Sequence, residues 1–102
     1  MKKKFNIQIE DKTKIEIADA YEWYEEQKTG LGEIFLKAFE KAIGTIQKSP
    51  DGYTQVKQYR QFPLKNFPFV ILYEINNETM FIDAVFHTSR NPKEKIKKQF
   101  PH

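Results

Sequence analysis

The stretch WYEEQKTGLGEIFLKAFEKAIGTIQKSP, residues 23 to 50, decides the fold. Its second half carries apolar residues at every third or fourth position: Phe35, Ala38, Phe39, Ala42, Ile43 and Ile46. Residues with this spacing form one stripe along an amphipathic helix. The pattern predicts a helix that begins near Gly32 or Glu33 and is stopped by the sequence SPDG at residues 49–52.

The residues before this helix predict a strand and an earlier helix. Lys4 to Glu10 alternates apolar and polar residues, which is typical of a strand. Asp11 can cap a helix that runs to about Lys28, and Gly30 suits a left-handed helix end. The short link makes the two helices an antiparallel hairpin. Three aromatic residues of the first helix are interpreted as packing between the helices: Tyr21, Trp23 and Tyr24.

Three further strands are predicted after the hairpin, at Gln55–Gln61, Phe67–Ile75 and Thr79–His87. The middle one is nearly all apolar, as in a central strand that is buried on both faces. Asn76-Asn77 tolerates the positive φ of a tight turn, and Lys93–Gln99 is long enough for a short terminal helix. The order β-α-α-β-β-β predicts one α+β domain over residues 1–102, with the helical hairpin on one face of a mostly antiparallel sheet.

The composition excludes several classes of protein. The chain of 102 residues contains no cysteine, so disulfides and thiolate metal sites are excluded. No residue pattern indicates a metal or a cofactor. No apolar run approaches the roughly 20 residues of a membrane span, so we expect a cytoplasmic protein without a membrane partner.

The charges are distributed unevenly along the chain. Residues 11–28 carry six acidic side chains, whereas residues 52–73 carry Lys57, Arg60 and Lys65 and no acid. Such asymmetry indicates a polyanion or an acidic peptide as partner. The neighbouring acids Glu25 and Glu26 are expected to be solvated on the helix surface.

The last predicted strand ends in candidate functional residues. Its members on one face are expected to pack on the helices: Met80, Ile82, Ala84 and Phe86. Asp83 and His87 would then point to the open face of the sheet. We expect four basic residues to meet on that face: Arg60, Lys65, His87 and Arg90. Arginine binds phosphate oxygens through its planar fork, and histidine can move a proton near neutral pH. Two residues keep other interpretations: His87 as a structural residue, and Arg60 as an ordinary surface arginine or as an ion-pair partner of Glu74 or Asp83.

Three motifs together resemble a known family. They are the helical hairpin of residues 23–50, the segment YRQFPLKNFPFVILYEI at 59–75, and the strand end AVFHTSRNP at 84–92. In this order, from about Asp19 to Pro92, the chain resembles the RelE/ParE superfamily of toxins from bacterial type II toxin–antitoxin systems. The His-x-x-Arg-Asn-Pro ending is similar to the ParE-like branch.

The resemblance implies a growth-inhibiting toxin, and a cognate antitoxin that covers a basic, apolar groove. A ParE-like toxin would act on DNA gyrase, and this reading is slightly favoured. A RelE-like toxin would instead cut mRNA on the ribosome without a metal, with His87, Arg60 and Arg90 as catalytic residues. In either case Arg60, Lys65 and Arg90 are the expected target-binding residues. A third reading is an antitoxin-binding protein that has lost toxicity.

Overall fold

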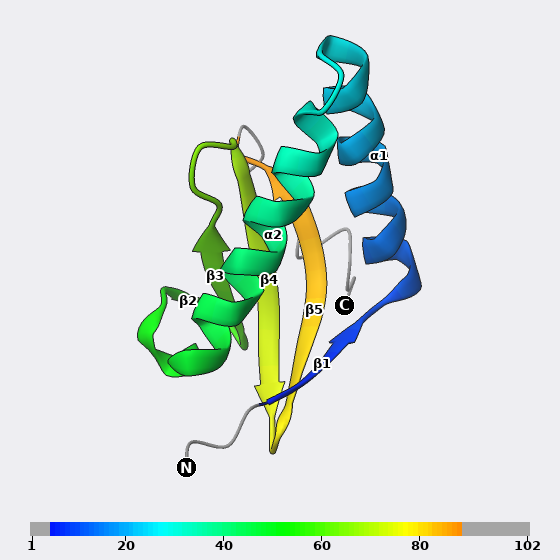
Figure 1. The fold of residues 1–102 in the computed structure, drawn as a ribbon. Helices are drawn as coiled ribbons and strands as arrows, with labels where there is room; N and C mark the ends of the chain where they lie inside the picture. The colour runs from blue at the N-terminus through cyan, green and yellow to red at the C-terminus, as the bar shows by residue number, and fades with distance from the viewer. Residues whose placement is uncertain (1–4, 89–102) are drawn as a thin grey trace.

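Two helices lie over one face of a five-stranded sheet in the computed structural model, which describes residues 5–88 (Figure 1). In chain order the elements are β1 (Asn6–Ile9), α1 (Asp11–Gln27), α2 (Leu31–Lys48), a 3-10 turn η1 (Pro50–Gly52), β2 (Gln55–Val56), β3 (Tyr59–Pro63), β4 (Phe69–Asn76) and β5 (Thr79–His87). The α+β class and the helical hairpin on one sheet face are confirmed. The helix predicted at Lys93–Gln99 lies outside the described residues.

The helical hairpin closes through Gly30 and Glu25. Gly30 has a φ of 91°, a left-handed conformation that costs glycine little, and α2 begins at the next residue. The Oε1 atom of Glu25 accepts hydrogen bonds from the backbone N–H groups of Gly30 and Gly32, at 2.9 and 2.8 Å. These donors belong to the start of α2, where no helical carbonyl can reach them. The expectation that Glu25 is a solvated surface acid is therefore wrong.

The predicted apolar stripe of α2 supplies the core between the helices and the sheet. Four members of the stripe are buried: Phe35, Phe39, Ala42 and Ile46. Phe35 is fully buried, and its ring lies 5.4 to 5.5 Å from the rings of Tyr24, Phe67 and Phe69. Full burial of one such side chain stabilises a fold by about 1.5–3 kcal/mol. This aromatic cluster joins both helices to the start of β4.

The sheet has the order β1-β5-β4-β3-β2, in which β1 runs parallel to β5 and all other pairs are antiparallel. The single strand predicted at Gln55–Gln61 is two strands, because the chain turns at Lys57 with a φ of 57°. β3 then continues to Pro63, where the sequence predicts a break. β2 pairs with β3 only as far as Arg60, so the outer edge of β3 at Pro63 has no strand beside it. Proline has no backbone N–H, and at this open edge its absence costs no hydrogen bond between strands.

A bulge in β5 reverses the alternation of its side chains. Leu72 lies opposite Ala84 and Tyr73 lies opposite Ile82, so Asp83 is an extra residue in β5. Before and after the bulge, the core residues that face the helices are Met80, Ile82 and Val85. Ala84 and Phe86 belong to a separate cluster with Tyr59 and Leu72. The prediction that Ala84 and Phe86 pack on the helices is therefore wrong, since strict alternation holds only within an uninterrupted ladder.

Side chains of α1 hold this bulge. β1 pairs with β5 only as far as Ile82, so the next backbone groups of β5 have no strand beside them on that edge. The Thr13 hydroxyl donates a hydrogen bond to the carbonyl oxygen of Asp83 at 2.9 Å. The backbone N–H of Val85 donates to Oε1 of Glu16 at 3.1 Å. α1 thereby fixes the position from which β5 runs on to His87.

Candidate functional site

His87 lies on the side of β5 that faces the helices. It is directly opposite Phe69 of β4, and the two ring centroids are 5.5 Å apart. Phe69 packs against the core beneath the helices, and directly opposite residues point to the same face. The bulge explains this orientation, because after it Val85 and His87 share the helix-facing side. The expectation that His87 points to the open face is therefore wrong.

Arg60 is turned toward η1 at the start of β3. Its Nη1 atom donates hydrogen bonds to the carbonyl oxygens of Asp51 and Tyr53, at 3.1 and 2.9 Å. The neighbouring Tyr73 donates its hydroxyl to the carbonyl oxygen of Pro50 at 2.7 Å. Burial raises the pKa of Tyr73 to about 12, although the charge of Arg60 acts in the opposite direction. Arg60 thus binds the backbone that follows α2.

The structure does not bring Arg60 and His87 together. Arg60 lies opposite Tyr73, whereas His87 lies opposite Phe69, four residues farther along β4. Four residues of a strand span on the order of 13 Å, and β4 itself separates the two residues across the sheet. The expected meeting of these two side chains is therefore wrong. Arg90, the fourth basic residue of the prediction, lies outside the described residues.

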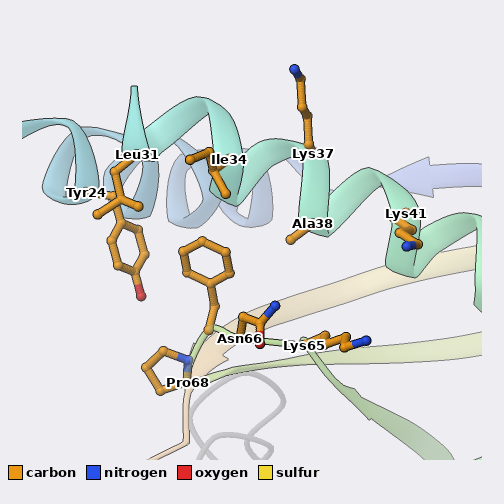
Figure 2. A pocket seen from close by; sticks show the side chains of 10 residues that line it. Tyr24, Leu31, Ile34, Lys37, Ala38, Lys41, Lys65, Asn66 and Pro68 are labelled. Atoms are coloured by element: carbon orange, nitrogen blue, oxygen red, sulfur yellow. The ribbon is translucent and has the colours of Figure 1, made fainter. Parts of the chain in front are cut away.

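Lys65 instead borders a hollow between α2 and the β3–β4 connection, which we call the basic groove (Figure 2). The first part of the groove has a volume of about 590 Å³. It is lined by Tyr24, Leu31, Ile34, Lys37, Ala38, Lys41, Lys65, Asn66, Phe67 and Pro68. A second part of about 290 Å³ shares Lys41 and Lys65 and extends to Thr45 and Phe62. Among the described residues that line the groove, three are lysines and none is acidic.

The turn at Asn66 positions the residues of the β3–β4 connection that line this groove. Asn66 has a φ of 68°, a left-handed conformation that asparagine tolerates better than most residues. The turn directs Phe67 into the aromatic cluster around Phe35 and leaves Lys65 exposed. Figure 2 shows Lys41 and Lys65 at the same end of the groove, with Ala38 between α2 and the loop and Lys37 pointing away. The groove therefore has an apolar floor and a cationic border.

A separate hollow of about 450 Å³ is lined by His87 and shares Tyr24 and Pro68 with the basic groove. Its remaining lining residues are Trp23 and Phe69. Trp23 is 56% exposed and meets Tyr24 edge to face, with ring centroids 5.1 Å apart. The interpretation of Trp23 as packing between the helices is therefore wrong. Exposed tryptophans beside a hollow are frequent anchors of protein interfaces.

The opposite face of the sheet carries an acidic cluster around Asp83. Burial, a hydrogen bond with Glu74, and the charges of Glu74 and Glu10 raise the pKa of Asp83 from 3.8 to about 8, while Lys12 lowers it. Tyr59 lies in the same neighbourhood, and burial together with these acids raises its pKa to about 12. The neighbouring acids Glu74 and Glu10 add negative charge on this side, so the open face does not suit the nucleic-acid contact that the sequence predicts.

The sequence-based prediction of a basic, apolar groove did not locate it beside α2, although a signal for this position exists. Ile34, Lys37, Ala38 and Lys41 follow the spacing i, i+3, i+4 and i+7, a second stripe beside the main stripe of α2. An isoleucine on an otherwise charged helix face is the residue that stands out. Within residues 5–88, no three His, Cys, Asp or Glu side chains are placed to hold a metal ion. No helix in the same range has the length and hydropathy needed to span a membrane.

Comparisons with known proteins identify the family. The family described as "ParE toxin of type II toxin-antitoxin system, parDE" matches residues 7–92. Among solved structures, a chain of the chromosomal ParDE TA system from P. aeruginosa is similar, with a TM-score of 0.72 and 12% sequence identity. The similarity covers 81% of this chain and 95% of that chain, and at such low identity it shows the fold alone. No curated protein matches the sequence. Because the family match spans most of the sequence, the chain belongs to the ParE toxins of type II toxin–antitoxin systems.

Proposed function

We propose that the protein inhibits growth by acting on DNA gyrase and that a cognate antitoxin neutralises it. The chain belongs to the ParE toxins, which supports both the toxic activity and the existence of an antitoxin partner. The observation that favours gyrase over RNA cleavage is the separation of Arg60 from His87. The two residues lie opposite Tyr73 and Phe69, four positions apart on β4, and on different neighbouring strands.

Cleavage of mRNA would need these residues at one phosphate group. A general base acts only within hydrogen-bond reach of the proton that it removes, and a cation must contact the same phosphate. The guanidinium of Arg60 is engaged by the carbonyl oxygens of Asp51 and Tyr53, at the far end of β3 from the hollow of His87. A toxin that works by binding gyrase has no such geometric requirement. The contributions of Arg60, Lys65 and Arg90 to target binding stay predictions.

The test of the target uses purified gyrase. We expect the protein to abolish supercoiling of a relaxed plasmid or to trap gyrase on cleaved DNA. The matched assay incubates the protein with translating ribosomes and maps mRNA ends by primer extension. Unaffected gyrase together with new mRNA ends would replace the gyrase proposal with ribosome-dependent RNA cleavage.

The basic groove is the proposed contact for the antitoxin. Its apolar floor and its three lysines suit an amphipathic peptide with acidic residues along its border. Induction of the chain alone should arrest growth, and co-expression of the protein encoded by the adjacent reading frame should restore it. Lys37→Glu/Lys41→Glu should stay toxic, because both lysines are exposed on α2 and the fold should be kept. It should escape the rescue, because the new acidic side chains repel the acidic residues of the antitoxin. Normal growth on induction would instead support an antitoxin-binding protein without toxicity.

A further inference from the structure

A face of α1 repeats the residue spacing of the basic groove with opposite charge. Seven α2 residues line the groove; two are Leu31 and Ala42, and the five that carry the repeated spacing are Ile34, Lys37, Ala38, Lys41 and Thr45. At the same intervals α1 carries Ile15, Ala18, Asp19, Glu22 and Glu26, and all five are exposed. The intervals i+3, i+4, i+7 and i+11 keep residues on one side of a helix. Each set therefore forms a face about 16 Å long, with acids on α1 and lysines on α2.

Both faces begin with an exposed isoleucine. Among the described residues the large apolar side chains with high exposure are Ile15 at 60%, Trp23 at 56% and Ile34 at 57%. Exposed isoleucines that stand at the same position in two oppositely charged faces can cover each other when the charges meet. We call the α1 residues Ile15, Ala18, Asp19, Glu22 and Glu26 the acidic face.

We propose that the acidic face of one molecule docks into the basic groove of a second copy of this chain. If the two helices lie parallel, Ile15 packs beside Ile34 at the wide part of the groove. Glu22 and Glu26 then lie toward Lys41 and Lys65, which Figure 2 shows at one end of the groove. The three acids of the acidic face match in number the three lysines that line the groove, so surfaces of opposite charge cover each other.

The two surfaces belong to different sides of the helical layer. Figure 1 shows α2 between α1 and the β3–β4 connection that borders the groove. A contact between unlike surfaces is heterologous, so each added copy leaves one acidic face and one groove open. Association should therefore continue beyond the dimer. The opposed charges are exposed, which makes the contact weak and sensitive to salt.

This inference stands apart from the proposed function but concerns the same groove. A bound antitoxin would occupy the surface that a second copy needs. Self-association and neutralisation would then exclude each other, and the free toxin would be the form that associates.

The test is sedimentation velocity of the purified chain over a roughly hundredfold range of concentration. At about 0.02 M salt the mean mass should rise with concentration, and at about 0.5 M salt, where the Debye length is near 4 Å, the chain should be monomeric. Lys37→Glu/Lys41→Glu and Asp19→Lys/Glu22→Lys should each weaken association roughly tenfold, about 1.4 kcal/mol. An equal mixture of the two variants should recover it, since the reversed charges complement each other. Lys28→Glu/Lys57→Glu changes two exposed lysines outside both surfaces and should behave like the original chain.

Three results would overturn the proposal. One is a monomer at low salt and at every concentration, which would leave the groove to the antitoxin alone. Another is association that both charge-reversed variants retain while their circular dichroism shows an intact fold. The third is a mixture of the two folded variants that stays monomeric, because a contact between these two surfaces must recover when both are reversed in sign.

Discussion

The carboxylate of Glu25 lies 2.8 Å from the backbone nitrogen of Gly32 and ties the end of α1 to the first turn of α2. The same oxygen accepts the N–H of Gly30 at 2.9 Å. Glu25→Ala leaves both donors without this partner, so we expect a loss of about 1–3 kcal/mol in the free energy of unfolding. Glu26→Ala is the matched control, because Glu26 is exposed and an isolated surface charge contributes about 0–1 kcal/mol. Urea unfolding of both variants measures the difference, and equal losses would show that the capping role is absent.

A second prediction compares two glycines of α2. A Cβ at Gly32 would lie 2.8 Å from the backbone oxygen of Tyr21 and 2.7 Å from Cγ of Glu25, whereas a Cβ at Gly44 meets nothing within 4 Å. Gly32→Ala should therefore push the helices apart and lower the free energy of unfolding by about 1–3 kcal/mol. Gly44→Ala should raise it by about 0.5–1 kcal/mol, because alanine favours a helix interior. Thermal unfolding gives the sign of each change, and a stabilising Gly32→Ala would show that the hairpin has room there.

A third prediction concerns pH and Asp83. Burial and the neighbouring acids Glu74 and Glu10 raise the pKa of Asp83 from 3.8 to about 8, with Lys12 acting in the opposite sense. Between these two values the folded protein holds a proton that the unfolded chain has released. The contribution of Asp83 to stability is therefore full below about pH 4 and is lost as the pH rises to about 8. Its slope is at most about 1.4 kcal/mol per pH unit.

Asp83→Asn tests this pH dependence, because an amide keeps the shape of the protonated carboxyl group and cannot ionise. Urea unfolding between about pH 5 and about pH 8 should show a smaller loss of stability for the variant than for the original chain. Asp19→Asn, at an exposed position of α1, should keep the original slope. If Asp83→Asn also keeps that slope, the carboxyl group is ionised in the folded state.

The helical hairpin could be predicted from the sequence because its signals are local. The α2 stripe, the left-handed Gly30 and the stop at Pro50 each act within a few residues, and all three are found in the structure. Which side chains of β5 face the helices could not be predicted in this way. The bulge at Asp83 depends on the register with β4 and on two hydrogen bonds with α1. The Thr13 hydroxyl donates to Asp83, 70 residues away along the chain, and the Glu16 carboxylate accepts from Val85, 69 residues away.

The meeting of Arg60 and His87 was wrongly predicted for the same reason. A reversal of alternation at Asp83 moves His87 to the helix-facing side, and the register of β3 places Arg60 beside η1. Neither fact follows from residue types. The basic groove needs the loop at Asn66 to lie beside α2, which is also a tertiary relationship. What the resemblance to the toxin family does imply is a basic, apolar groove, and Lys65 is the predicted residue that lines the groove found here.

The last prediction separates binding from catalysis at His87. His87→Gln keeps a polar side chain of similar size beside Phe69, and His87 is exposed at the end of β5, so the fold should be retained. If the toxin binds gyrase and performs no proton transfer, growth inhibition by this variant should stay within about twofold of the original. Loss of a general acid or base would instead lower the rate by roughly 10²–10⁴-fold. The measurement is growth after graded induction, with protein levels and thermal unfolding checked for each variant. Arg60→Gln serves as the comparison, because it removes the hydrogen bonds to Asp51 and Tyr53 and should lower stability as well as toxicity. A fully folded His87→Gln protein that no longer arrests growth would favour RNA cleavage over action on gyrase.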